Sequence, residues 1–312
     1  MRGVGIFEFG APEVLRVLDL PEVHAGPGEI RLRVHAAAVN PTDLSARNGA
    51  RAETLRQDAP PYVPGMDAAG VVDEIGPDTD TDLTVGVPVM AMVVPGGNHG
   101  AYRESIVLSV DSVARAPRGF SHSEVATLPM NGLTARLSLD QLALRPGQTI
   151  AVTGAAGAYG GYVIQIAKTE GLTVIADASA DDKSLVKCLG ADVVVPRGDD
   201  FSQQVRMVVP DGVDGLADGA VLSELAVGSI RDGGAFAAVR GWEGTGERDI
   251  TFHQTMVRNY DHRSDLLDQL RQLAENKAVT LRVAETYDPI EASEAHRRLE
   301  ARGTRGRCVI VF

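Results

Sequence analysis

The sequence predicts an α/β protein with two domains: a barrel-like β domain, followed by an open, doubly wound parallel sheet. Up to about residue 120, short apolar stretches are separated by Gly and Pro turns, with no helical pattern between them. That arrangement is typical of a small β-barrel. From residue 121 onward, apolar strands alternate with helical patterns, as in a parallel sheet covered by helices. The 312 residues are enough for two domains of ordinary size.

The first predicted strand follows the Pro27-Gly28 turn, where Ile30, Leu32 and Val34 alternate with polar residues. Such alternation indicates a strand with one buried face. Three further strands are expected in this domain, at residues 69–75, 85–94 and 101–110. Residues 47–64 show no clear period, and we expect a loop at the mouth of the domain.

The second half of the chain alternates between the two element types. Helices are expected at residues 124–128, 132–142, 182–189 and 222–227, and on the face formed by Phe201, Val205 and Val208. Strands are expected at residues 150–153, 172–176, 193–195, 215–217 and 235–239. Gly190 is expected to cap the helix that ends at residue 189. Two amphipathic helices follow, one containing Leu266, Leu267, Leu270 and Leu273, the other at 292–299, before a last strand at 308–312.

We expect the last strand to return to the β domain. The predicted division is therefore residues 1–120, completed by 265–312, for the β domain, and residues 121–264 for the parallel-sheet domain.

A glycine-rich turn connects the first strand of the parallel sheet to a helix. The strand at residues 150–153 leads into Gly154-Ala155-Ala156-Gly157-Ala158-Tyr159-Gly160, and a helix starts directly afterwards. Such a turn places backbone N–H groups and the positive end of the helix dipole against a dinucleotide diphosphate. Small residues are needed there because a larger side chain would hold the backbone away from the phosphates. We predict a dinucleotide site made by Gly154, Ala156, Gly157, Ala158, Tyr159 and Gly160.

The composition excludes several other classes of protein. A formal net charge of −12 argues against nucleic acid or an anionic membrane surface as the main partner. The two cysteines are too few for a disulfide framework or a four-cysteine zinc site. No apolar run approaches the roughly 20 residues of a membrane helix. We expect a cytoplasmic protein that acts on a small molecule.

Several motifs in order resemble the zinc-free branch of the medium-chain dehydrogenase/reductase superfamily, the quinone oxidoreductase-like proteins. The resemblance covers nearly the whole chain. It is carried by residues 39–43 with Arg47 and Gly49, residues 63–70, Gly100-Ala101-Tyr102, Leu128-Pro129, residues 132–135, residues 147–168 with Gln165, Glu294-Ala295-His296 and Gly306. One departure is Gly157-Ala158-Tyr159-Gly160, where the family usually has Gly-Gly-Val-Gly.

The resemblance implies a GroES-like substrate domain, a Rossmann cofactor domain and an active site in the cleft between them. It also implies that Asn40 and Thr134 hold the nicotinamide end of the cofactor. Asn40 has an alternative interpretation with nearly equal support, as a cap of the turn into Pro41. Asp43 is likewise either a site residue or the N-cap of a short helix through Arg47. Similar proteins often dimerise through edge strands of the cofactor domain, and residues 234–239 are a candidate edge.

Catalytic zinc is not expected. The zinc branch has a Cys in the stretch matching residues 40–44 and His-Glu in the stretch matching Met66-Asp67, and Zn²⁺ needs such ligands. Some enoyl reductases that the chain resembles have a tyrosine proton donor just after the glycine matching Gly49, where this sequence has Ala50-Arg51. The catalytic residue is therefore unknown. The proton is expected to come from water, with the protein orienting the reactants.

Two signals for the choice of nicotinamide cofactor conflict. Asp177 follows Gly157 by about 20 residues, where an acid accepts a hydrogen bond from the ribose 2′-hydroxyl of NAD. Ser179 and Lys183 resemble the groups that bind the 2′-phosphate in NADP-dependent relatives, and Arg197 is a third possible donor. The alternative for Ser179 is the N-cap of the helix beginning near residue 182, and for Lys183 an exposed surface position. We favour NADPH, with NADH as the alternative.

The expected function is zinc-independent hydride transfer from NADPH to a quinone or an α,β-unsaturated carbonyl compound. One alternative is a tailoring enoyl or ketone reductase dedicated to a single pathway. The other is a nucleotide-binding redox sensor without catalysis, which Tyr159 and the missing tyrosine donor support. A homodimer is expected.

Overall fold

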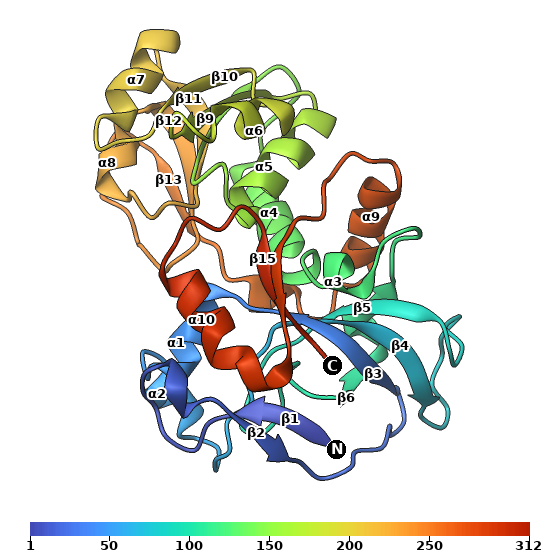
Figure 1. The fold of residues 1–312 in the computed structure, drawn as a ribbon. Coiled ribbons are helices and arrows are strands. Elements are labelled where there is room, and N and C mark those ends of the chain that lie inside the picture. Colours follow the sequence, from blue (N-terminus) through green and yellow to red (C-terminus); the bar gives the residue numbers. More distant parts are fainter. The chain divides into compact units, whose positions relative to one another are not determined.

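A computed structural model describes all residues from 1 to 312, and the chain in it divides into two units. Unit 1 consists of residues 1–130, 258–275 and 281–312, and unit 2 of residues 131–257 and 276–280. The expected boundaries at residues 120 and 264 stay a prediction about the folding domains. Each unit is built around one large sheet (Figure 1).

The sheet of unit 1 is organised around β3 (Glu29–Ala38). This strand pairs antiparallel with β4 (Asp67–Ile75), β6 (Ser105–Ser109) and β15 (Arg307–Val311). Its apolar side chains at residues 30, 32 and 34 are buried, which confirms the predicted alternation. The remaining strands of this sheet are β5 (Pro88–Met92), β7 (Val113–Arg115) and β14 (Val283–Tyr287).

The pairing of β15 with β3 confirms that the C-terminal strand returns to the β domain. Strand β14, which pairs parallel with β15, was not predicted because its side chains are mostly exposed and carry no apolar alternation.

Unit 1 also contains the helices α1 (Pro41–Arg47), α2 (Ala52–Leu55), α3 (His122–Val125), α9 (Ser264–Glu275) and α10 (Ala292–Glu300), and the 3₁₀ turns η1 (Pro12–Val14), η2 (Val110–Ser112) and η4 (Pro289–Glu291). The expected loop at 47–64 therefore contains one short helix, α2.

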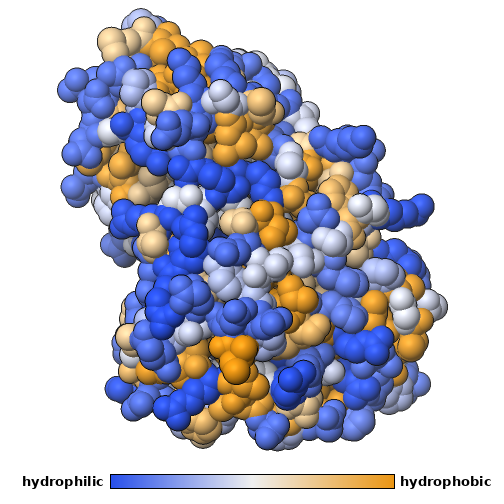
Figure 2. Space-filling model, in the orientation of Figure 1, coloured by the Kyte–Doolittle hydropathy of each residue, from blue (hydrophilic) through white to orange (hydrophobic).

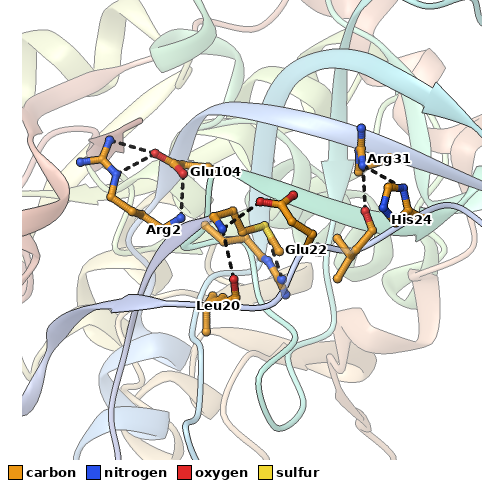
Figure 3. A network of polar contacts seen from close by, with 9 residues as sticks. Arg2, Leu20, Glu22, His24, Arg31 and Glu104 are labelled. Atoms are coloured by element: carbon orange, nitrogen blue, oxygen red, sulfur yellow. Dashed lines mark hydrogen bonds and ion pairs between the residues drawn. The ribbon is translucent and has the colours of Figure 1, made fainter.

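A two-stranded sheet of β1 (Arg2–Gly5) and β2 (Arg16–Asp19) completes unit 1. Polar contacts fasten it to the rest of the unit (Figure 3). Arg2 Nε donates to Glu104 Oε1 at 2.9 Å, and on β3 the Nη1 atom of Arg31 donates to the Val23 carbonyl at 2.8 Å. A partly exposed charged pair such as Arg2–Glu104 contributes little stability, so the buried side chains of the sheet hold this unit together.

Unit 2 contains a six-stranded, all-parallel sheet in the order β10-β9-β8-β11-β12-β13. Its strands are β8 (Thr149–Thr153), β9 (Thr173–Ala178), β10 (Val193–Pro196), β11 (Val213–Asp218), β12 (Ile230–Ala238) and β13 (Thr251–Gln254). Helices lie on both faces of this sheet (Figure 1). They are α4 (Pro129–Leu142), α5 (Ala158–Thr169), α6 (Lys183–Cys188), α7 (Phe201–Val208) and α8 (Glu224–Val227). The boundary between the two units lies in the first turn of α4. The 3₁₀ turn η3 (Val257–Tyr260) ends this part of the chain. The doubly wound fold is as predicted.

The predicted edge of this sheet is wrong. Residues 234–239 belong largely to β12, which has β11 on one side and β13 on the other. The outer strand is β13, whose four residues are half-buried or exposed, so its sequence has no strong strand pattern. Gly190, by contrast, follows the C-cap residue of α6, Leu189, and has a φ of +107°, which confirms its expected place at the helix end.

No helix is both long enough and apolar enough to cross a membrane. Polar residues cover most of the face seen in Figure 2, with apolar residues in separate patches between them. Only a few large apolar side chains are more than half exposed, namely Phe7, Val85, Met207 and Ile290. Isolated apolar side chains on a surface are ordinary.

Candidate functional site

The glycine turn of unit 2 has the geometry of a diphosphate cradle. After β8 the chain turns at Gly154, with φ of +65°, and the Gly157 N–H donates to the Gly154 carbonyl at 2.9 Å. Helix α5 then starts at Ala158, and Ala156 is buried beneath the turn. A Cβ on Gly160 would lie only 2.5 Å from the Gly154 carbonyl oxygen, whereas one on Gly157 would meet a single atom, at 3.1 Å. Gly160 is therefore needed for packing, whereas a side chain at Gly157 would meet only the Gly154 carbonyl oxygen.

The first turn of α5 presents unpaired amides. The first N–H to bond back to the turn from within the helix is that of Gly161, which donates to the Gly157 carbonyl at 3.0 Å. The N–H groups of Ala158, Tyr159 and Gly160 precede it and have no carbonyl one turn earlier in the helix to bond. Together with the helix dipole, they form a site suited to an anion.

Asp177 stabilises this turn through a hydrogen bond. Its side chain is 1% exposed at the end of β9. Oδ1 accepts from the Ala155 N–H at 3.0 Å, and Oδ2 accepts from Arg197 Nε at 3.1 Å. A buried carboxylate with these partners fixes the turn and is poorly placed to accept from a ribose hydroxyl. This geometry weakens the signal for NADH in the sequence.

The three predicted 2′-phosphate residues follow neighbouring strands. Arg197 and Ser179 come directly after the paired ends of β10 and β9, and the Arg197 N–H donates to the Ala178 carbonyl at 2.9 Å. Lys183 is exposed at the start of α6. The alternative for Ser179 is wrong, because the N-cap position belongs to Asp182. The Ser179 hydroxyl instead donates to Asp182 Oδ2 at 2.6 Å.

Tyr159 directs its side chain toward α4 and the end of β11. Its hydroxyl lies 2.8 Å from Ser138 Oγ, and a Cβ on Gly219 would lie 2.7 Å from its Cδ1 atom. Ser138 donates its only hydroxyl hydrogen to the Thr134 carbonyl at 2.9 Å, so Tyr159 is the donor to Ser138. The hydroxyl is committed to α4, and burial raises its pKa well above the ordinary value.

The loop after β11 was not predicted as part of the site. Asp218 is buried and accepts from the Thr153 hydroxyl at 2.5 Å and from the Ser223 N–H at 2.8 Å. The Thr153 hydroxyl in turn accepts from the Ala220 N–H at 3.0 Å. A polar residue at the carboxyl end of a buried strand was the available signal, because ligands of parallel sheets bind at that edge.

In unit 1, Asn40 and Asp67 form a buried pair. Asn40 Nδ2 donates to Asp67 Oδ2 at 2.6 Å, and the Met130 N–H donates to Asp67 Oδ1 at 2.6 Å. Asn40 is fully buried and occupies the N-cap position of α1. This arrangement favours its alternative interpretation, at the turn into Pro41. Thr134, the other predicted nicotinamide residue, lies in α4 and is 8% exposed.

Asp43 is not the N-cap of α1 but its third residue. Its Oδ2 atom accepts from the Asn40 N–H at 2.8 Å and from the Tyr102 hydroxyl at 3.2 Å, and Oδ1 accepts from the Gly65 N–H at 2.9 Å. The Tyr102 hydroxyl also lies 3.3 Å from His296 Nε2. This series of hydrogen bonds connects α1 to α10 through buried side chains.

Burial shifts the pKa values of this cluster away from ordinary values. It raises the pKa of Asp43 to about 6 and that of Asp67 to about 7, against hydrogen bonds that favour the ionised forms. Burial and the charge of Arg47 lower the pKa of His296 to about 3. His296 is therefore neutral in the folded protein at physiological pH.

The stretch that carries zinc ligands in the zinc branch is occupied here by other contacts. The Thr42 hydroxyl donates to Met66 Sδ at 3.0 Å, beside the Asn40–Asp67 pair. An amide and a thioether are poor partners for Zn²⁺, which prefers thiolate, imidazole and carboxylate. No group of three or more His, Cys, Asp or Glu side chains in the chain is arranged to hold a metal ion.

Comparison with known proteins matches both units. Residues 26–118 match the alcohol dehydrogenase GroES-like domain, and residues 189–310 match the zinc-binding dehydrogenase family. A crystal structure of an NAD-dependent alcohol dehydrogenase is 30% identical with a TM-score of 0.88, each chain being covered completely. The chain belongs to the quinone oxidoreductase-like family of medium-chain dehydrogenases/reductases. The family binds NAD(P)H, and the chain spans 52% and 64% of the length of two curated relatives that it matches.

Curated relatives agree with this assignment. The chain is 28% identical to the quinone oxidoreductase of Mus musculus over 335 residues, covering 100% of this chain and 98% of that protein. It is 34% identical over 209 residues to the mouse mitochondrial NAD(P)H oxidoreductase RTN4IP1, covering 61% of this chain but only 52% of the relative. Among solved structures, the mycobacterial protein Rv1454c complexed with NADPH is 25% identical with a TM-score of 0.86, each chain being covered completely.

Proposed function

We propose that the protein transfers hydride from NADPH to a quinone or an α,β-unsaturated carbonyl compound without zinc. The observation that carries this proposal is the glycine turn, with three first-turn amides of α5 open to an anion and Asp177 bracing the turn from below. The quinone oxidoreductase of the mouse, which matches over almost its full length, supports the choice of acceptor.

The residues fit a nicotinamide dinucleotide. The amides of Ala158, Tyr159 and Gly160 would hold the diphosphate, and Gly157 leaves the space that it needs. When bound, the dinucleotide supplies the hydride, so the protein has to orient the acceptor and exclude water. Thr134 is proposed at the nicotinamide end. Asn40 is proposed near the nicotinamide end because of its position at the start of α1. Its side-chain amide is not proposed as a donor to the cofactor, because its hydrogens donate to Asp67 and to the Ala38 carbonyl.

NADPH is proposed over NADH because two cations flank the end of β9. Lys183 is exposed and makes no ion pair, and Arg197 is bound to Asp177 only through Nε, so its terminal nitrogens are free for a phosphate. The Ser179 hydroxyl donates to Asp182 and would have to turn to contribute. The NADPH complex of Rv1454c supports this choice, whereas the NAD-dependent alcohol dehydrogenase does not.

We propose that the reaction uses no zinc and no tyrosine acid. In the stretch where the zinc branch binds its metal, Asn40 donates to Asp67 and Thr42 donates to Met66, and this donor set does not suit Zn²⁺. Tyr159 donates to Ser138, so its proton is committed. Water remains the proposed proton source. The cytoplasmic location and the homodimer also remain proposals.

Titration with NADPH and NADH, followed by an acceptor screen with quinones and enones, tests this function. We expect NADPH to bind at least tenfold more tightly than NADH, which corresponds to about 1.4 kcal/mol, and to be oxidised by at least one acceptor. Tighter binding of NADH would overturn the assignment of Lys183 and Arg197. Tight NADPH binding with no oxidation by any acceptor would favour the non-catalytic alternative.

A further inference from the structure

Tyr159 is the one bulky residue in a turn of small residues, and its side chain connects three elements of unit 2. It starts in the first turn of α5, its hydroxyl donates to Ser138 on α4, and its ring packs on Gly219 directly after β11. The backbone N–H of the same residue belongs to the proposed diphosphate cradle. A displacement of this side chain would therefore also shift a backbone amide of the proposed diphosphate site.

The loop that the ring contacts is strained. Residues 219–223 follow β11, and Val221 and Ser223 have φ angles of +60° and +52°. A β-branched residue rarely adopts such a conformation unless its surroundings impose it. Asp218 and Thr153 anchor the loop from the sheet side, and the ring of Tyr159 packs against its first residue. The loop also touches the turn, since a Cβ on Gly154 would lie 3.0 Å from the Ala220 nitrogen.

The strand order places this contact on one side of the turn. β8 has β9 on one side and β11 on the other. The proposed 2′-phosphate residues follow β9 and β10, so the adenosine half of a dinucleotide lies on that side. A dinucleotide that crosses the turn then has its nicotinamide half on the side of β11, where the ring of Tyr159 meets the loop.

We propose that Tyr159 is a positioning residue for the nicotinamide half of the dinucleotide, because it holds the loop 219–223 against the glycine turn. The inference rests on the proposed function. The loop in this chain is fitted to an aromatic ring, so the valine of relatives is not a neutral replacement.

The test compares Tyr159→Val and Tyr159→Phe with a matched control, Tyr162→Phe, on the same helix. Each variant is titrated with NADPH and with 2′,5′-ADP, which carries the adenosine half only; ADP replaces it if NADH is the tighter dinucleotide. We expect Tyr159→Val to weaken NADPH about tenfold and 2′,5′-ADP less than twofold. Tyr159→Phe, which keeps the ring, should lose about threefold, and the control should match the unaltered protein.

Hydrogen exchange of the ligand-free protein gives a second readout. The amides of residues 220–223 should exchange faster in Tyr159→Val, with the strands of the sheet unchanged. Equal weakening of both ligands, unchanged affinity for NADPH, or unchanged exchange of the loop would each overturn the inference while leaving the proposed function intact. Absence of any dinucleotide binding to the unaltered protein would overturn both.

Discussion

The proposed choice of cofactor rests on single side chains. Asp177 carries the sequence signal for NADH, yet its carboxylate is 1% exposed and bonded to Ala155 and Arg197. Once this acid is buried and paired, its repulsion of a 2′-phosphate is reduced, because the charge of Arg197 opposes it. We therefore propose that Lys183, which is exposed at the start of α6 and makes no ion pair, is the main determinant of the preference for NADPH.

Substituting Lys183→Ala should weaken NADPH about tenfold and leave NADH within twofold, because only NADPH carries the 2′-phosphate. Fluorescence titration of both cofactors measures the ratio. Lys187→Ala is the matched control on α6, since Lys187 donates to the Asp192 carbonyl and lies outside the proposed site. An equal loss for both cofactors would show that Lys183 does not bind the 2′-phosphate.

His296 makes the stability of the fold depend on pH. Its pKa is lowered from 6.5 to about 3 by burial and by Arg47. Between these two pH values, His296 is protonated in the unfolded chain and neutral in the folded chain. The stabilising contribution is present above about pH 6.5 and is lost as the pH falls toward 3. Asp43 and Asp67, with pKa values raised from 3.8 to about 6 and 7, act in the opposite direction and lose their contribution as the pH rises through those values.

Comparison with His296→Gln isolates this effect. Below pH 6.5 the free energy of unfolding of the unaltered protein should fall relative to the variant by about 1.4 kcal/mol per pH unit. Denaturant unfolding of both proteins between pH 4 and 8 gives the difference. If that difference stayed constant with pH, His296 would not be a neutral buried residue.

At the scale of elements, the start of α5 assigns separate roles to its glycines. Gly160 has no room for a Cβ, because the Gly154 carbonyl oxygen and the Ala155 Cα would lie 2.5 Å and 2.8 Å away. Gly157, with φ of −71°, has a backbone conformation that alanine adopts, and a Cβ there would meet only the Gly154 carbonyl oxygen, at 3.1 Å. Gly160 thus allows α5 to pack on the turn, and Gly157 leaves space for the proposed ligand.

Two variants separate these roles. Gly160→Ala should destabilise the protein by roughly 1–3 kcal/mol through overpacking. Gly157→Ala should change stability by only about 0.5 kcal/mol and should weaken NADPH at least tenfold. Chemical denaturation and cofactor titration of both variants provide the measurements. A stable Gly160→Ala protein with full affinity would contradict the described packing of α5.

At the scale of the whole molecule, the outer edge of β13 is the proposed dimer contact. An unpaired edge is a template for another strand, and β13 has β12 on one side only. The Thr255 N–H donates to the Ala238 carbonyl, so the N–H of Gln254 points away from β12, since amides alternate along a strand.

Light scattering should give a mass of twice 33.0 kDa for the unaltered protein. Gln254→Pro removes the outward amide and should produce a monomer, while Gln254→Ala keeps the amide and should remain a dimer. A dimer that survives Gln254→Pro would place the contact elsewhere.

Local patterns in the sequence were sufficient for the fold and for the place of the turn. The alternation along β3, the strand–turn–helix around Gly157 and the glycine after α6 depend on side chains close in sequence, and the structure bears them out. The strands β13 and β14 were missed because they have weak sequence patterns. Pairing with neighbouring strands stabilises them, and burial of their own side chains contributes little.

Only the tertiary structure decided what the polar residues do. Asn40 had two interpretations in the sequence, and its bond to Asp67 favours the one at the turn into Pro41. The bond of Asp177 to Arg197, and the contacts of Tyr159 with Ser138 and Gly219, have no signal in the sequence. A side chain's chemistry depends on its burial and its partners, and these are set by packing between distant segments. The sequence by itself therefore determined where the glycine turn of the proposed dinucleotide site lies, and the packed fold determined which polar groups around that turn are already bonded to other residues.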